Sequence, residues 1–110
     1  MNAESETSKA MAINLKDYVE YAKDSIVSKT LIEKKGGTIT LFAFDQGQGL
    51  SEHTAPFDAV VQILEGEAKI TIGENLVRAL PGQMVIMLAN IPHSVKAVRR
   101  FKMLLTMIRA

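Results

Sequence analysis

The sequence predicts a single all-β domain, built as a sandwich or a closed barrel. From about residue 25 onward, short runs rich in β-branched residues show a hydrophobic period of two, which is typical of strands. Gly, Asn or Pro separates these runs about every ten residues, where tight turns require such residues. A chain of 110 residues is long enough for one domain and too short for two. Full closure of the sheet would also remove the exposed edges that many short strands otherwise carry.

The N-terminal region is expected to differ from the rest of the chain. Residues 1–12 are small and polar without a hydrophobic period, so we expect a disordered leader, followed by one domain over residues 13–110. A short helix is expected where this domain begins, because Asn14 can cap a segment whose apolar residues recur at helical spacing. These apolar residues are Leu15, Tyr18, Val19 and Ala22.

Nine strands are expected after this segment. They cover residues 25–34, 37–45, 50–55, 58–66, 67–73, 75–80, 83–88, 93–99 and 102–109. In the fourth run, Ala59, Val61 and Ile63 share one face, and the residues between them share the other. Both faces are partly apolar. We therefore expect the outer face to meet the N-terminal strands or a partner subunit.

The composition excludes several classes of function. A net charge of +1 leaves no basic excess to neutralise a nucleic-acid backbone, so no nucleic-acid partner is expected. The chain has no cysteine, which excludes disulfides, thiolate metal sites and a cysteine nucleophile. No apolar run reaches about 18 residues and the N-terminus lacks a signal-peptide pattern, so we expect a cytoplasmic protein without membrane contact.

The stretch from Gly47 to Gly66 resembles the first motif of the cupin superfamily. That motif is a Gly, five residues, His-x-His, three or four residues, Glu, six residues and Gly. The spacing of residues 47–66 fits at every step, and His53 occupies the first His position. Alanines occupy the positions of the second His and the Glu.

Residues 82–97 resemble the second cupin motif, which is a Gly, five residues, Pro-x-Gly, two residues, His, three residues and Asn. The first Gly and the His are kept here, as Gly82 and His93. Together the two motifs make the chain similar to a single-domain small cupin over about residues 37–109.

The resemblance implies a double-stranded β-helix, which is a small jelly-roll barrel with a pocket inside. Family members are commonly dimers that exchange or pair N-terminal strands, so residues 25–34 are expected to take this role in a homodimer. In the family, the His-x-His pair, the Glu and the late His bind one divalent metal. Carried over by position, His53 and His93 remain as ligands, while Ala55 and Ala59 supply no donor atom.

The chemistry that these residues can support stays open at this point. Two imidazoles alone bind a metal poorly, so we expect either no cofactor or one weakly bound divalent ion such as Zn, Mn, Fe or Ni. Asp58 could join His53 and His93 only if a β-bulge turned its side chain inward. Without a metal, the two histidines could act as a general acid and base, because imidazoles titrate in the physiological range.

The expected pocket is small and largely apolar, and it would bind an unidentified small molecule. Its predicted wall consists of His53, Ala55, Ala59, Val61, Ile63, Met84, His93 and Met107. Of the four methionines that could enter it, Met84, Met87, Met103 and Met107, we expect two to be ordinary core.

The function that these features favour is binding of a small organic molecule without catalysis. One alternative is an isomerase, dioxygenase or lyase that acts on a small sugar, carbonyl or aromatic substrate, with His53 and His93 as its catalytic or metal-binding residues. A second alternative is a structural or partner-binding barrel whose pocket is vestigial.

Overall fold

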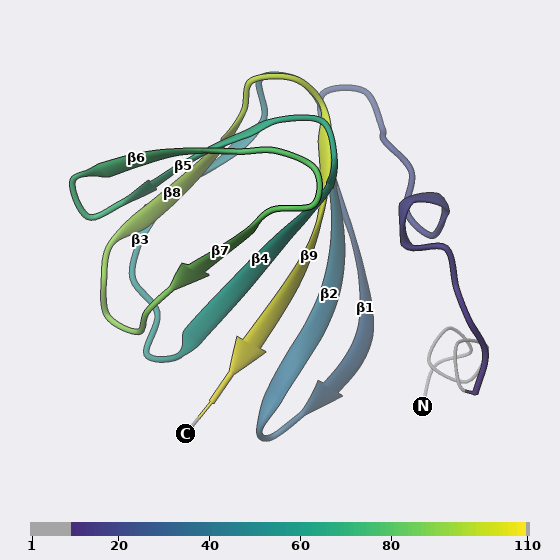
Figure 1. The fold of residues 1–110 in the computed structure, drawn as a ribbon, viewed down its shortest axis with the longest axis horizontal. Coiled ribbons are helices and arrows are strands. Elements are labelled where there is room, and N and C mark those ends of the chain that lie inside the picture. Colours follow the sequence, from purple (N-terminus) through teal and green to yellow (C-terminus); the bar gives the residue numbers. More distant parts are fainter. Residues whose placement is uncertain (1–9, 110) are drawn as a thin grey trace.

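A computed structural model describes residues 10–109 and shows two antiparallel sheets packed against each other (Figure 1). The strands are β1 (Ile26–Lys34), β2 (Gly37–Phe44), β3 (Gly49–His53), β4 (Asp58–Glu65), β5 (Ala68–Ile72), β6 (Asn75–Ala79), β7 (Met84–Met87), β8 (His93–Ala97) and β9 (Phe101–Ile108). One sheet has the order β1-β2-β9-β4-β7, and the other has the order β3-β8-β5-β6. All nine expected strands are present, with bounds within two residues of those predicted.

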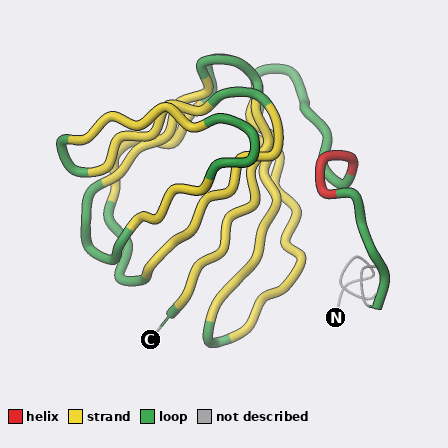
Figure 2. The backbone as a smooth tube through the Cα atoms, viewed as in Figure 1, coloured by secondary structure: helices red, strands yellow, loops and turns green. Residues whose placement is uncertain are grey.

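The two-sheet arrangement confirms the predicted jelly-roll architecture. Strands make up most of the described chain after residue 25, and the loops lie at the ends of the sheets (Figure 2). The pairs β2·β9, β4·β9 and β3·β8 join strands that lie far apart in the sequence. Such pairing brings distant parts of the chain together around the main core. Within residues 10–109, no helix is long and apolar enough to cross a membrane.

The main core lies between the inward faces of the two sheets. Phe44 and Phe101 are fully buried there, and their rings stack with centroids 4.5 Å apart. As the alternation predicts, Ala59, Val61 and Ile63 of β4 are all buried in this core. Offset aromatic stacking stabilises a core beyond the area that the rings bury.

The expected N-terminal helix is wrong, because the segment forms only a single 3-10 turn, η1 (Leu15–Asp17). Asn14 makes no side-chain cap hydrogen bond, so the start of a helix is not stabilised. The Lys102 ammonium of β9 donates a hydrogen bond to the Lys16 carbonyl, which in a longer helix would accept from Glu20. A segment this short has little helical stability of its own, so its contacts with the sheet decide its conformation.

Residues 15–24, here called the N-terminal strap, cover part of the outer face of the five-stranded sheet. Val19 is 3% exposed and packs with Leu41 and Ala43 of β2. The Tyr21 hydroxyl donates a 2.6 Å hydrogen bond to Glu65, and the Arg100 guanidinium lies over the Tyr21 ring. Burial and the bond to Glu65 raise the pKa of Tyr21 well above its usual range. Of the leader expected at residues 1–12, residues 1–9 lie outside the described chain.

The turn between β4 and β5 depends on Gly66. Its φ of +81° lies in the left-handed region, where residues with a side chain are strained. A β-carbon at this position would also collide with the Arg100 carbonyl oxygen and with Phe101. Glycine therefore fits this turn for two independent reasons.

Candidate functional site

A cavity of about 350 Å³ lies between the two sheets. Its wall consists of Leu50, His53, Thr54, Ala55, Pro56, Phe57, Ala59, Met87, His93, Val95, Met103, Leu105 and Met107. Only the two histidines and Thr54 carry polar side chains in this wall. The cavity can therefore surround an apolar body while offering polar contacts at few points.

The structure brings five of the predicted pocket residues together in this wall: His53, Ala55, Ala59, His93 and Met107. Val61 and Ile63 do not line the cavity. They share the inward face of β4 with Ala59, but they are fully packed in the core. Inward orientation therefore does not suffice to place a residue at the cavity.

Met84 lies outside the cavity as well. It is 56% exposed on the outer face of β7, and Met87 takes a place in the wall instead. The burial of β7 alternates strictly, with Val85 and Met87 inward and Met84 and Ile86 outward. Of the four methionines considered, Met87, Met103 and Met107 contact the cavity.

Other wall residues escaped the sequence prediction for identifiable reasons. Val95 is two residues from His93, and Leu105 is two residues from Met107, so strand alternation alone could have found both. Leu50 could not be found in this way, because simple alternation would place it opposite to His53. The register of β3 against β8 shifts between these two residues, which brings both side chains into the wall.

The two histidines face each other across the β3·β8 ladder. His53 is the last residue of β3, His93 is the first of β8, and the register pairs them directly. Their ring centroids are 4.4 Å apart, with an angle of 65° between the ring planes. His93 is only 8% exposed, so its ring forms the inner part of the pair. His53 is exposed and forms the outer part.

Both rings are held in the same way. The Nδ1 atom of His53 lies 2.8 Å from the Ser51 carbonyl oxygen, and that of His93 lies 3.1 Å from the Ile91 carbonyl oxygen. A carbonyl oxygen can only accept, so Nδ1 carries the hydrogen in both rings. In the neutral rings Nε2 is then an acceptor, and no group within residues 10–109 hydrogen-bonds either Nε2.

The loop between β3 and β4 forms one side of the cavity and is tied to the loop before β8. The Asn90 amide donates a 2.8 Å hydrogen bond to the Ala55 carbonyl, and the Ala89 amide donates one of 2.8 Å to the Asp58 carboxylate. Asn90 has a φ of +64°, a left-handed conformation that Asn tolerates better than most residues. Beside this loop, the Arg109 guanidinium lies 5.6 Å from the centre of the Phe57 ring.

Comparisons with known proteins identify the family. The model of the AraC-like ligand binding domain matches residues 35–108. The chain belongs to this cupin-type family. A comparison with curated proteins gave no match.

Solved structures agree with this assignment. A conserved protein of unknown function from Streptococcus pyogenes is 39% identical, with a TM-score of 0.88 over 92% of this chain and 89% of that one. A cupin superfamily protein from Desulfitobacterium hafniense is 26% identical, with a TM-score of 0.87 over 93% and 94% of the two chains. A cupin 2 conserved barrel domain protein from Leptotrichia buccalis is 38% identical over 88% of this chain and 47% of that one, with a TM-score of 0.85.

This cupin does not carry the four-ligand metal site that the family motif implies. Ala55 and Ala59 occupy two of the four ligand positions and lie in the cavity wall without a donor atom. Asp58 is exposed, and its carboxylate accepts from the Ala89 amide; the register shift in β4 lies at the other end of the strand. Within residues 10–109, no group of three or more His, Cys, Asp or Glu side chains could hold a metal ion.

The carboxylates with perturbed pKa values in the described chain lie away from the cavity. Hydrogen bonds from the backbone amides of Asp24 and Gln46 lower the pKa of Asp45, and the Arg100 guanidinium adds to this effect. The pKa of Glu67 is lowered mainly by its hydrogen bond from Arg78. Neither carboxylate lines the cavity, so both shifts belong to structural interactions.

Proposed function

We propose that this cupin binds a small organic molecule in the cavity, with a polar group of the ligand against His53 and His93. A volume of about 350 Å³ falls within the range of natural ligand pockets, which begins at roughly 300 Å³. The observation that supports this proposal most strongly is the pair of Nε2 acceptors in a wall where Thr54 carries the one other polar side chain. The match to a family described as ligand binding points in the same direction.

The geometry of the two rings favours one kind of polar group. Because Nδ1 of each ring donates to a carbonyl, the atom that a ligand can reach on each ring is an acceptor. An acceptor that loses its water on ligand binding must gain a donor, since an unpaired buried polar atom is costly. The ligand should therefore combine an apolar body with a hydroxyl or another hydrogen-bond donor.

A matched pair of probes tests this function. p-Cresol and toluene differ by one hydroxyl group, and both are small enough for the cavity. We expect p-cresol to bind about tenfold more tightly than toluene in calorimetric titrations, because one satisfied hydrogen bond contributes on the order of 1 kcal/mol. In the variants His53→Ala and His93→Ala, this preference should shrink. Absence of binding by both probes, or a hydroxyl preference that survives both substitutions, would contradict the proposal.

The contact between the His53 and His93 imidazoles is the observation that supports the enzymatic alternative. Rings 4.4 Å apart can serve one substrate as acid and base, as an isomerase or lyase acting on a small carbonyl, sugar or aromatic compound requires. A divalent ion such as Zn, Mn, Fe or Ni would find two imidazole ligands here and would need water or substrate to complete its coordination. Elemental analysis of protein purified without chelators tests the metal, with the His53→Ala/His93→Ala double variant as control.

A vestigial barrel is the least supported alternative. A structural role would favour a pocket filled by side chains, because empty volume in a core costs stability. Here Met87, Met103, Met107 and Phe57 surround the cavity without filling it. The open volume thus favours an occupant over a purely structural interior.

A further inference from the structure

The last strand carries the wall of the cavity outward to a cation at the rim. Met103, Leu105 and Met107 of β9 all line the cavity, because every second residue of a strand shares one face. Arg109 is the next residue in this series, directly after the end of β9. Its amide donates a 2.8 Å hydrogen bond to the Gly36 carbonyl, so the chain stays paired at this point. The exposed Arg109 therefore continues the inward face of β9 at the surface.

The side chain of Arg109 lies beside the cavity wall. Its guanidinium is 5.6 Å from the centre of the ring of Phe57, a half-buried wall residue of the loop between β3 and β4. The register brings these two residues together. Asp58 pairs with Ile108, so the residue before Asp58 and the residue after Ile108 lie side by side. A cation near an aromatic ring is attracted to it, which favours this position of the guanidinium.

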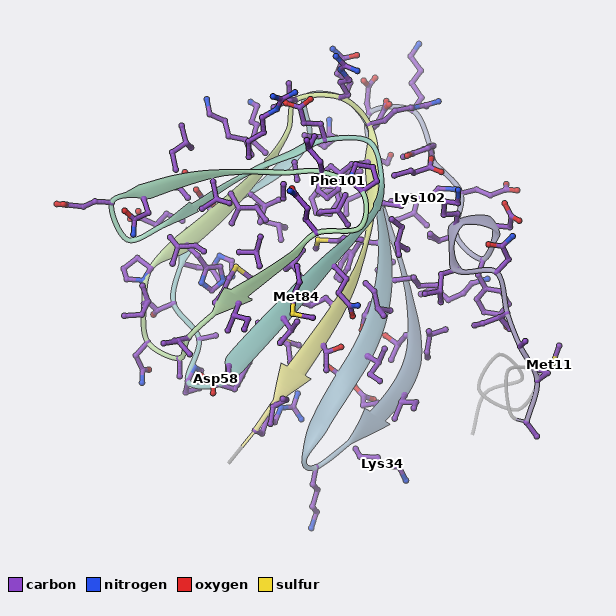
Figure 3. All side chains as sticks on the ribbon, viewed as in Figure 1. Met11, Lys34, Asp58, Met84, Phe101 and Lys102 are labelled. Carbon is purple, nitrogen blue, oxygen red and sulfur yellow. The ribbon has the colours of Figure 1, made fainter. Side chains whose placement is uncertain are left out.

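The rim at Arg109 lies at one end of the molecule. Figure 3 shows Asp58, which follows Phe57 in the chain, and Lys34, whose carbonyl accepts a hydrogen bond from Arg109, at the end opposite to Phe101. The loop that carries Phe57 begins directly after His53. The histidine pair and Arg109 thus border the same cavity from two sides, the first in the four-stranded sheet and the second after a strand of the five-stranded sheet.

Arg109 differs from the other arginines of the chain in its partners. Each of the other three acts on a carboxylate: Arg78 and Arg99 lower the pKa of Glu67, and Arg100 lowers that of Asp45. Within residues 10–109, no carboxylate forms an ion pair with Arg109. Its one side-chain hydrogen bond in this part of the chain, to the Lys34 carbonyl, is 3.4 Å long. A guanidinium carries several N–H donors in a rigid fork, so most of them remain available to a ligand.

We propose that the ligand of this cupin is an amphipathic carboxylate, whose apolar body lies in the cavity and whose carboxylate binds the Arg109 guanidinium at the rim. This inference rests on the proposed function, because it adds a second anchor for the same ligand. The planar fork of an arginine matches a carboxylate through two parallel hydrogen bonds. The donor group of the ligand then meets His53 and His93, and its acidic group lies at the other end of the molecule that binds.

The surroundings favour the rim over the interior for an acidic group. Inside the cavity, a carboxylate would lose its water and would meet the Nε2 acceptors of His53 and His93. At the rim, the exposed Arg109 lets the carboxylate keep part of its hydration and gain charge-assisted hydrogen bonds. Asp58, beside Phe57 in the chain, points to the other face of β4 and accepts from the Ala89 amide, so it leaves Arg109 to the ligand.

Acids and their amides test this anchor as matched pairs. p-Hydroxybenzoate, p-hydroxyphenylacetate and p-hydroxyphenylpropionate place the carboxylate at increasing distance from the hydroxyl group, and each has a neutral amide of nearly the same shape. At about pH 7.5 the three acids are ionised. We expect the acid with the fitting length to bind about fivefold more tightly than its amide in calorimetric titrations, because partly exposed ion pairs contribute modestly. Equal affinity of acid and amide at all three lengths would overturn the proposal.

Three variants separate a specific contact from general attraction. Arg109→Gln should abolish the preference for the acid and leave the affinity for the amide unchanged. Arg109→Lys keeps the charge without the fork, so it should retain part of the preference. Arg99→Gln is the matched control, because it removes the same charge from the exposed loop that precedes β9, at the opposite end of this strand. A preference that survives Arg109→Gln, or one that is lost equally in Arg99→Gln, would show that Arg109 is not the anchor.

p-Cresol distinguishes failure of this inference from failure of the proposed function, because it carries the hydroxyl group without a carboxylate. If p-cresol binds in a histidine-dependent manner and the acids bind no better than their amides, the anchor at Arg109 is wrong and the proposed function stands. If the acids depend on Arg109 but bind His53→Ala/His93→Ala as tightly as the wild type, the histidine contact is wrong and the anchor stands. Absence of binding by every probe would overturn both.

Discussion

His53 and His93 form a direct cross-strand pair whose rings meet at 4.4 Å, and the backbone carbonyl two residues earlier holds each ring. This repeated arrangement gives the cavity two acceptors of the same kind. The surrounding wall is almost entirely apolar. A polar contact in such surroundings discriminates strongly between ligands, because a mismatched group stays unpaired away from water.

The protonation of the pair can be measured directly. At about pH 8, nitrogen NMR of the imidazoles should show the hydrogen on Nδ1 in both rings, since each Nδ1 faces a carbonyl oxygen. The variant His53→Ala assigns the two sets of signals and should leave the tautomer of His93 unchanged, because Ile91 holds that ring independently. A hydrogen on Nε2 in either ring would show that the inferred acceptor is wrong.

Restoring the two missing donors should create a metal site. Ala55→His/Ala59→Glu places an imidazole and a carboxylate at the family's ligand positions, and both residues already line the same cavity as His53 and His93. We expect the double variant to bind one equivalent of Zn²⁺ in calorimetric titrations, at least about a hundredfold more tightly than the natural chain, because four ligands complete a tetrahedral site.

Addition of His93→Ala to this double variant is the matched control and should abolish most of the gain. If the double variant and the natural chain bind Zn²⁺ with equal affinity, the side chains at positions 53, 55, 59 and 93 do not converge on one site.

The turn at Gly66 should be sensitive to a single methyl group. Gly66→Ala combines a left-handed φ with a collision against the Arg100 carbonyl, so we expect a loss of at least about 2 kcal/mol in the free energy of unfolding. Gly47→Ala is the control, because its φ of +86° is equally unusual while no atom lies within 4 Å of the added carbon. Its loss should be about 1 kcal/mol. Urea unfolding measures the free energy of unfolding of both variants. Equal losses would show that the collision with the Arg100 carbonyl does not contribute.

Asp45 should make the stability depend on acid pH. Its pKa is lowered in the folded state by the amides of Asp24 and Gln46 and by Arg100. A carboxylate with a lowered pKa stabilises the fold at pH values above its unfolded pKa, and this contribution is lost as the pH falls through the lower, folded value. Asp45→Asn should therefore unfold in urea with a smaller difference between neutral pH and about pH 3 than the wild type. If the wild type and Asp45→Asn lose the same unfolding free energy between neutral pH and about pH 3, the ionised Asp45 carboxylate does not stabilise the fold.

Much of the fold was predictable because its signals are local. The runs from residue 25 onward alternate with a period of two and end at glycine, asparagine or proline, so each strand was found within two residues. The prediction of an N-terminal helix was wrong because contacts with the sheet, rather than local spacing, decide the conformation of that segment. The spacing of Leu15, Tyr18 and Val19 fits a helix, yet these side chains pack as an irregular strap on the sheet.

The cavity was predictable only in part. Alternation groups Ala59 with Val61 and Ile63 on the inward face of β4. Which of the three borders the cavity depends on where the two sheets leave space between them. Met84 and Met87 have opposite orientations, and no local signal tells which of them faces inward. Leu50 reaches the wall only through the register shift of β3, which the pairing with β8 determines.

The sequence by itself determined the strands, the jelly-roll family and the identity of the two histidines, because the period of two and the spacing of the motifs are properties of neighbouring residues. Tertiary structure alone decided that His53 pairs with His93 and that Asp58 turns outward to the Ala89 amide. These features depend on the register between strands that are distant in the chain. Such registers are set by closure of the whole barrel, and no single segment contains the information.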